Sequence, residues 1–357
     1  RNDGRWDILA DQTITIDDTD ANTASDGLIG NGVFCLETIG DSATVCNGGS
    51  DVDEAAVASD LDLAQAGNTE FDGSFAGLGA LTKTGAGTLT LTDGQTFTGG
   101  LFVNGGEIKT KAASSAAFHD HLDITVGSAG TLSLNTADTV GSLTNAGIVA
   151  MNADTTADTM TNTGTMTLAE NVTLTTTVGV FGAGGTVNAG GSATLNLVGG
   201  LSGSGTVNIA QDGTLNLNQA DAFSMFDGTI IGSNTNGNES VLKVNETGGA
   251  ESQGVLTFGA NATVDVSRLE IAYATVALDG SELLDDGMTV YVGTSGALSI
   301  LDDADESITR VESVFKLDGA GEIYLGRNTF NIVDGGTFAG EFFGSGTLNV
   351  ENGDFAI

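Results

Sequence analysis

A short motif, Gly-Thr-apolar-x-apolar, recurs along the chain and constrains its fold more than any other feature. Its last three positions alternate apolar, small polar and apolar, which is the period-2 pattern of a strand with one buried face. The copies are GAGTLTL at 85–91, SAGTLSL at 128–134, GSATLNL at 191–197, GSGTVNI at 203–209, QDGTLNL at 211–217, SGALSI at 295–300 and GSGTLNV at 344–350. The sequence therefore predicts a repeat protein built from short strands.

The spacing of the copies predicts a solenoid. The first apolar residues of five copies are separated by near-multiples of about 21 residues, a length that fits one coil of a repeat architecture. These five residues are Leu89, Leu132, Leu195, Leu215 and Leu298. Val207 and Leu348 break this phase, so either they lie on a different face of the coil or the coils vary in length. A second echo, SLTNAGIV at 142–149 and TMTNTGTM at 159–166, repeats at a shorter interval and favours coils of variable length.

Glycine and proline usage agrees with a stack of parallel strands. The chain has 54 glycines and no proline. A central strand of a ladder needs its backbone N–H, which proline lacks, and tight corners between strands favour glycine or asparagine at positive φ. The fold class that we predict is all-β, a parallel β-helix (β-solenoid).

The charge of the chain excludes some partners. The 47 acidic and 10 basic residues give a formal net charge of −37. No basic stripe is present to neutralise phosphates, so we expect no nucleic-acid partner, and docking on anionic lipid is disfavoured. Calcium is the one ion that the acidic clusters suggest, since Ca²⁺ prefers carboxylate oxygens. The candidate ligands are Asp302, Asp303, Asp305 and Glu306, for which a solvated surface is the alternative.

Cysteine usage and hydropathy point to an exported protein. Cys35 and Cys46 are the only cysteines, and a single pair that closes a short loop favours a disulfide in an oxidising compartment over two buried thiols. No stretch of consecutive apolar residues approaches the length of a membrane-spanning helix, so we expect no membrane insertion. The first residues lack the apolar core of a signal peptide, so we expect a processed form or a fragment.

The composition and residue pattern of the chain change at about residue 70. Residues 1–70 are predicted to form a distinct N-terminal cap or arm, which includes a short amphipathic helix at Val52–Ala66. Residues 71–357 are predicted to form the solenoid, interrupted at Ala112–His121 by a helical or irregular excursion. The strand-like C-terminal residues lack a polar cap, which favours stacking on another molecule.

The segment LTKTGAGTLTLTDGQTFTGGLFVNGGEI at 81–108 resembles the passenger-associated transport repeat of bacterial autotransporter proteins. Within this segment the matching positions are Gly85, Gly87, Thr88, Leu89, Leu91, Thr96, Thr98, Gly99, Gly100, Val103, Asn104 and Gly106. The resemblance implies a right-handed parallel β-helix, displayed on or released from the surface of Gram-negative bacteria. Elsewhere only the GTLxL kernel of the repeat persists, and the C-terminal membrane barrel of that family is not apparent in the sequence.

The residues do not point to catalysis. His119 and His121 flank Asp120 at a spacing that would suit a metal, but a solvated loop is the simpler interpretation. No nucleophile elbow is apparent, and acidic pairs are too common to single out a catalytic pair. The alternative is a carbohydrate-active β-helix enzyme, a polysaccharide lyase or hydrolase. Rows of threonine residues also suggest ice binding as a further alternative.

We therefore expect a structural protein without enzymatic activity, secreted or exposed at the cell surface. Its roles would be those of an adhesin stalk or a self-assembling extracellular filament. The expected partners are further copies of the chain, stacked head to tail, and a cell-surface or glycan receptor.

Overall fold

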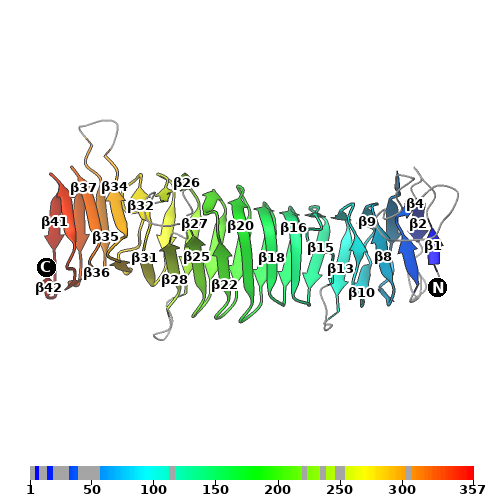
Figure 1. Ribbon diagram of the computed structural model, residues 1–357. Coiled ribbons are helices and arrows are strands. Elements are labelled where there is room, and N and C mark those ends of the chain that lie inside the picture. The colour runs from blue at the N-terminus through cyan, green and yellow to red at the C-terminus, as the bar shows by residue number, and fades with distance from the viewer. Residues whose placement is uncertain are drawn as a thin grey trace. The chain divides into compact units, whose positions relative to one another are not determined.

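The chain folds into stacked β-coils. The computed structural model describes residues 5–7, 14–18, 32–38, 57–111, 117–218, 223–233, 239–245, 254–302 and 308–357, and every regular element within these ranges is a β-strand (Figure 1). Two compact units divide the chain, residues 1–167 and residues 168–357. Within each unit, strands from successive coils lie side by side and pair in parallel, so the predicted all-β parallel β-solenoid is confirmed.

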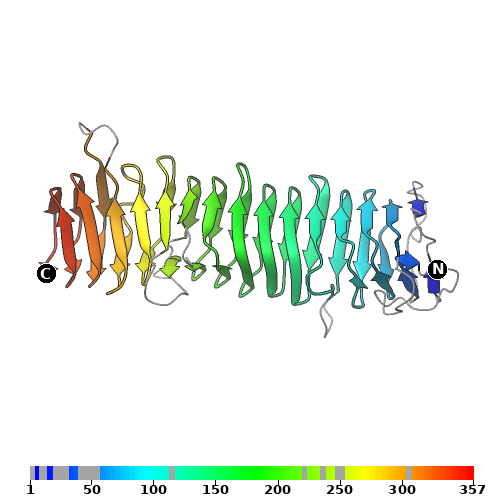
Figure 2. The same cartoon turned by 45° about the horizontal axis from the view of Figure 1, so that its top comes forward.

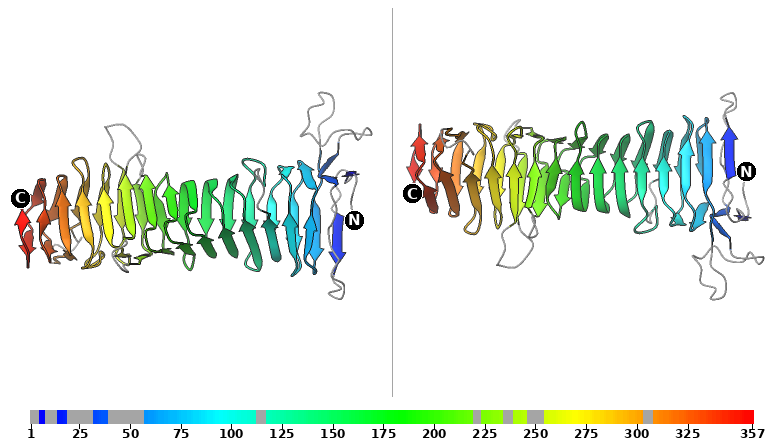
Figure 3. Two further views of the ribbon diagram at one scale, coloured as in Figure 1. Left: turned by 90° about the horizontal axis from the view of Figure 1, so that it is seen from below. Right: turned by 90° about the horizontal axis from the view of Figure 1, so that it is seen from above.

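Unit 1 arranges its strands in three runs of parallel neighbours (Figure 3). The first run contains β1 (Arg5–Asp7), β3 (Val33–Cys35), β8 (Ser74–Gly77) and β11 (Thr96–Phe97). The second contains β2 (Ile14–Asp18), β6 (Leu61–Gln65), β9 (Leu81–Thr84), β12 (Leu101–Val103), β14 (Ile124–Val126), β16 (Asp138–Asn145) and β18 (Thr155–Asn162). The third contains β7 (Thr69–Phe71), β10 (Thr88–Leu91), β13 (Gly106–Thr110), β15 (Gly130–Leu134) and β17 (Ile148–Met151). A short antiparallel pair joins β4 (Glu37–Thr38) to β5 (Val57–Ala58), and β19 (Thr165–Leu168) contains the last residues of the unit.

Unit 2 also has three runs (Figure 2), and from β22 to β32 successive strands along the chain take the runs in turn. The first run contains β21 (Thr186–Ala189), β24 (Thr206–Ile209), β27 (Thr229–Gly232) and β30 (Thr263–Asp265), followed by a separate stack of β35 (Val311–Val314), β38 (Thr329–Ile332) and β41 (Thr347–Val350). The second contains β20 (Thr173–Phe181), β22 (Thr194–Leu197), β25 (Thr214–Asn218), β28 (Val241–Asn245), β31 (Arg268–Ile271), β33 (Thr289–Val292) and β36 (Lys316–Gly319). The third contains β23 (Leu201–Gly203), β26 (Phe223–Phe226), β29 (Val255–Phe258), β32 (Thr275–Leu278), β34 (Ala297–Ile300), β37 (Glu322–Gly326) and β40 (Glu341–Gly344). The remaining pair is β39 (Gly336–Thr337) with β42 (Phe355–Ala356).

Aliphatic rows fill the interior of both units. Because side chains alternate along a strand and the coils are in register, one inward position per strand forms a row through the stack. In unit 1 one such row is Leu89, Ile108, Leu132 and Val149; in unit 2 one is Leu195, Leu215, Leu242, Leu269, Val290 and Leu317. Every member is at most 1% exposed. Each buried member of these rows stabilises its coil, at roughly 25 cal/mol per Å² of apolar surface removed from water.

The coils vary in length, as the sequence favoured. In unit 1 the coil that leads from Ile108 to its partner Leu132 is longer than the next coil, which leads from Leu132 to Val149. In unit 2 the coil from Leu215 to its partner Leu242 is longer than the preceding coil, in which Leu195 pairs with Leu215. Insertions at the corners absorb these differences, so the inward register is kept.

The regular spacing of the motif copies suggested that their apolar residues form one stacked row, and this prediction is wrong. Val207 lies on β24 of the first run, whereas Leu195 and Leu215 lie on the second run, which explains its short spacing. Leu298 does not continue the row of Leu215 either, since it lies on β34 of the third run and pairs with Val276. The same motif serves all three runs because each needs only an alternating strand after a glycine corner.

The predicted helix at Val52–Ala66 is wrong where the structure describes that segment. Residues 61–65 form the parallel strand β6, in which Leu61, Leu63 and Gln65 are buried. Their period of 2 outcompetes the loose helical spacing because the strand pairs on both sides. The described part of the Ala112–His121 excursion, residues 117–121, is a turn, and residues 112–116 lie outside the described residues.

Candidate functional site

One face of unit 2 carries an unbroken row of polar and aromatic side chains. The second run places one outward residue of each strand in register with the next; we call these residues the outward row. They are Thr175, Asn196, Asn216, Lys243, Glu270, Tyr291 and Asp318. All seven are half-buried or exposed, because the residues beside them on each strand point into the core.

Amide groups connect the first part of the outward row. The Asn216 side-chain amide donates to Asn196 Oδ1 at 3.1 Å, and the Asn196 amide donates to Thr175 Oγ1 at 3.4 Å. Asn245, on the neighbouring strand β28, donates to Asn216 Oδ1 at 3.0 Å. These contacts connect neighbouring side chains along the face, and each of these side chains is half-buried.

Ion pairs and a tyrosine form the second part of the row. Glu270 contacts both Lys243 Nζ at 3.4 Å and Arg268 Nε at 2.9 Å. The Arg268 guanidinium also lies 5.6 Å from the centroid of the Tyr291 ring, within cation–π range. Tyr291 is 39% exposed, so the ring lies beside a charged neighbour and is accessible to solvent.

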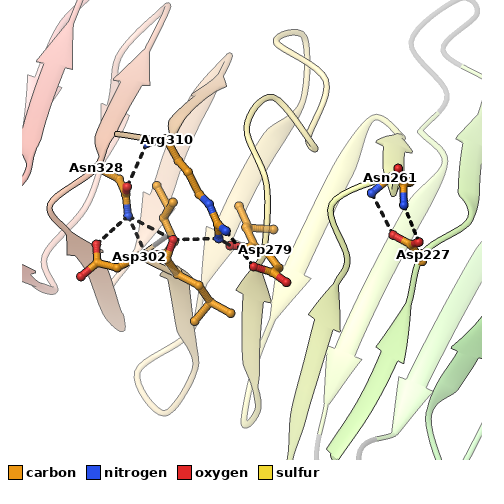
Figure 4. Close-up of polar contacts among 9 residues, drawn as sticks. Asp227, Asn261, Asp279, Asp302, Arg310 and Asn328 are labelled. Atoms are coloured by element: carbon orange, nitrogen blue, oxygen red, sulfur yellow. Dashed lines mark hydrogen bonds and ion pairs between the residues drawn. The ribbon is translucent and has the colours of Figure 1, made fainter. Parts of the chain in front are cut away.

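A second polar cluster occupies the corner that follows the third run of unit 2 (Figure 4). Arg310 Nη2 lies 2.9 Å from Asp279 Oδ1, and Arg310 Nη1 donates to the Leu301 carbonyl at 2.9 Å. Asn328, which is fully buried, accepts from the Arg310 backbone N–H and donates to the Ile300 carbonyl, both at 3.0 Å. This corner cluster is a satisfied structural network whose groups bind one another.

The same figure shows a smaller corner contact of the same kind. Asp227 binds Asn261 through two hydrogen bonds, 2.8 Å to the backbone N–H and 2.7 Å to the side-chain amide. A carboxylate that accepts from a turn in this way fixes the turn. The corners of unit 2 are therefore held by side chains as well as by the strand ladders.

Of the four predicted calcium ligands, the structure describes only Asp302. Asp302 accepts from the Arg327 backbone N–H at 2.9 Å and from Asn328 Nδ2 at 3.2 Å, so its Oδ1 already has two donors. Asp303, Asp305 and Glu306 lie outside the described residues. Among the residues that are described, no three His, Cys, Asp or Glu side chains are grouped so as to hold a metal ion. The calcium site stays a prediction.

The two histidines are both exposed. His121 Nδ1 contacts Asp158 Oδ2 at 2.8 Å, and this hydrogen bond raises the pKa of His121 above its usual value. His121 adopts a positive φ of 68°, which places it in a turn. The geometry describes a surface ion pair, in agreement with the solvated-loop interpretation.

Cys35 lies on β3 and is 1% exposed. Cys46 lies outside the described residues, so the predicted disulfide between them stays a prediction.

Several buried charged groups were not singled out from the sequence, and Lys83 and Glu312 are the two that are fully buried. Lys83 on β9 is fully buried, and its Nζ donates to the carbonyls of Thr84 at 2.7 Å and Gly85 at 3.0 Å; burial lowers its pKa to about 8. Glu312 on β35 accepts from the backbone N–H groups of Leu283 and Leu284, and burial raises its pKa to about 8. Their positions in the sequence could have identified them, since Lys83 and Glu312 both occupy inward positions of alternating strands. Each satisfies backbone groups at a corner.

Comparisons with known proteins agree with this architecture. In the described ranges, no helix has the length and apolar character needed to cross a membrane. Neither the curated proteins nor the solved structures gave a match to this chain. The sequence model described as passenger-associated-transport-repeat matches residues 81–109, which comprise β9 to β12 and most of β13. This repeat is associated with secreted or surface-exposed proteins, and together with the parallel β-solenoid it fits the β-helix of an autotransporter passenger.

Proposed function

We propose that this chain is a non-catalytic structural protein of the bacterial surface, an adhesin stalk or filament subunit exported from a Gram-negative cell. The observation that carries the proposal is the register of the second run in unit 2, where the inward residues from Leu195 to Leu317 follow one another strand by strand. Parallel ladders and aliphatic rows resist bending and extension along the stack. The repeat match at 81–109 supports an exported location.

We further propose that copies stack head to tail through β41. Leu348 and Val350 continue the inward rows of Phe330 and Ile332, which are fully buried. Val350 is nevertheless 41% exposed, because β41 pairs with β38 on one side only among the described strands. A strand of a second copy would cover both the backbone edge and these side chains.

Negative-stain electron microscopy and sedimentation of the purified chain test the stacking. We expect filaments whose length falls sharply in Val350→Lys, because a buried lysine without a partner opposes the contact. Thr347→Lys, on the same strand but at an outward exposed position, adds the same charge and is expected to leave assembly unchanged. A wild-type chain that stays monomeric at high concentration, or equal behaviour of the two variants, contradicts stacking.

Surface labelling of intact cells tests the location, and a screen on acidic and neutral polysaccharides tests the absence of catalysis. We expect antibody access without permeabilisation, or protein in the culture medium, and no shortened products. Depolymerised products would instead favour the carbohydrate-active alternative.

A further inference from the structure

We propose that the outward row of unit 2 is a docking surface for a linear, neutral polysaccharide. The proposal deepens the structural role and rests on surface exposure of the chain. It assigns a ligand class to one face, made by the second run from β20 to β36.

The spacing of the row suits a polymer that lies along the stack. Neighbouring strands are about 4.8 Å apart, so the row offers a hydrogen-bonding side chain at every step of that length. Asn196 and Asn216 supply amide donors and acceptors, and Glu270 supplies carboxylate oxygens. A polysaccharide repeats hydroxyl groups along its length, and these can both donate to and accept from such a surface.

Tyr291 supplies an apolar platform within this polar row. The ring is 39% exposed and lies between Glu270 and Asp318 in the register of the strands. A flat aromatic face flanked by carboxylates can pack against the C–H groups of a sugar while its hydroxyls donate to the acids. Arg268 lies 5.6 Å from the ring centroid, within cation–π range.

The charge of this face favours a neutral ligand. Lys243, Arg268 and Lys316, three of the ten basic residues of the chain, lie on the second run. Their described partners are Glu270 and Asp334, and Asp318 adds a further negative charge to the row. The three positive and three negative groups balance, although the whole chain carries −37. A polyanion would have to displace the acids from these pairs and approach a strongly negative protein, which costs electrostatic energy.

Calorimetric titration of the full chain with hexasaccharides tests the proposal. The probes are cellohexaose, laminarihexaose, mannohexaose and chitohexaose, with heparin as the anionic comparison. We expect at least one neutral probe to bind, Tyr291→Ala to weaken it by about tenfold, and Asn216→Ala to weaken it less. The matched control is Tyr324→Ala: Tyr324 is also 39% exposed but lies on the third run, so the affinity is expected to stay within about twofold.

Three results would overturn the proposal: no binding of any neutral probe, tighter binding of heparin than of every neutral probe, or equal losses in Tyr291→Ala and Tyr324→Ala. Circular dichroism melting of each variant shows that the fold is kept. A negative titration with normal surface labelling removes the ligand assignment alone, whereas failed labelling removes the proposed location.

Discussion

Both units bury aromatic and asparagine side chains, but they differ in where further side chains of these kinds lie. Unit 1 buries an aromatic cluster in which Phe75 lies 5.6 Å from Phe34, 5.1 Å from Phe71 and 6.3 Å from Phe97 between ring centroids. Unit 2 also buries rings, among them Phe226 and Phe258, but Tyr291 lies outward and Phe223 is 88% exposed. The parallel stack therefore accommodates aromatic residues at both inward and outward positions of its strands. A ring at an inward position stabilises the fold by burial, whereas a ring at an outward position is available to a partner.

Asparagine side chains also take both positions, and unit 2 has a buried example of its own in Asn328. In unit 1 Asn145 and Asn162 are fully buried, and Asn145 binds Asn162 Oδ1 at 2.8 Å, the Thr165 carbonyl at 3.0 Å and the Gly147 N–H at 3.0 Å. In unit 2 Asn196 and Asn216 bind each other on the surface. A buried amide satisfies backbone groups that water cannot reach, whereas a surface amide replaces bonds that water would also make.

Among substitutions that compare buried with exposed side chains, we expect the largest loss of stability in the aromatic cluster of unit 1. Phe75→Ala should lower the free energy of unfolding by about 3–5 kcal/mol, because it removes a fully buried ring and leaves a cavity. Phe223→Ala, the exposed counterpart in unit 2, should change it by less than about 0.5 kcal/mol. Denaturant unfolding followed by circular dichroism measures both, and similar costs would mean that the assigned burial is wrong.

The buried amide comes next. Asn145→Ala should cost about 1–3 kcal/mol, since it leaves the Gly147 N–H and the Thr165 carbonyl without this partner. Asn216→Ala should cost no more than about 0.5 kcal/mol. Hydrogen exchange can localise the effect, and the Gly147 amide should lose protection only in the first variant. Unchanged protection at Gly147 would contradict the corner role of Asn145.

Glu312 predicts a pH dependence in unit 2. Its folded pKa of about 8 lies above the ordinary value of 4.5, so the folded state holds a proton that the unfolded state releases. The contribution to stability is full below pH 4.5 and is lost as the pH rises through about 8. Glu312→Gln should flatten this decline, measured as unfolding midpoints across that pH range. An identical decline in the variant would assign it to other groups.

Lys83 predicts a smaller pH dependence of opposite sign in unit 1. Its folded pKa of about 8 lies below 10.5, so the unfolded state binds more protons between these values and stability should rise with pH from about 8 to 10.5. Lys83→Met should remove the rise, and methionine suits the site because Leu63 and Val103 occupy the same row. Unfolding midpoints across this range test the sign, and a fall with pH in the wild type would refute it.

Much of the fold could be predicted, and rather less of the candidate site. The alternating triplet at 89–91 and its copies identified buried leucines correctly, because a period of 2 has one structural meaning in a half-buried strand. The prediction of a helix at Val52–Ala66 is wrong because the alternating residues 61–65 lie within a longer segment whose apolar residues also fit helical spacing loosely. Glu270 and Tyr291 could not be related from the sequence, since they lie on different strands a whole coil apart and only the pairing of β31 with β33 makes them neighbours.

The sequence by itself determined that this chain forms short strands with glycine corners, since alternation and the lack of proline act locally. The tertiary structure decided which run each strand joins, because corner insertions of different length change the spacing while the inward rows keep the register. Leu195 and Val207 carry the same motif yet lie on different runs. The outward row exists only through that stacking, which brings residues of seven strands onto one face.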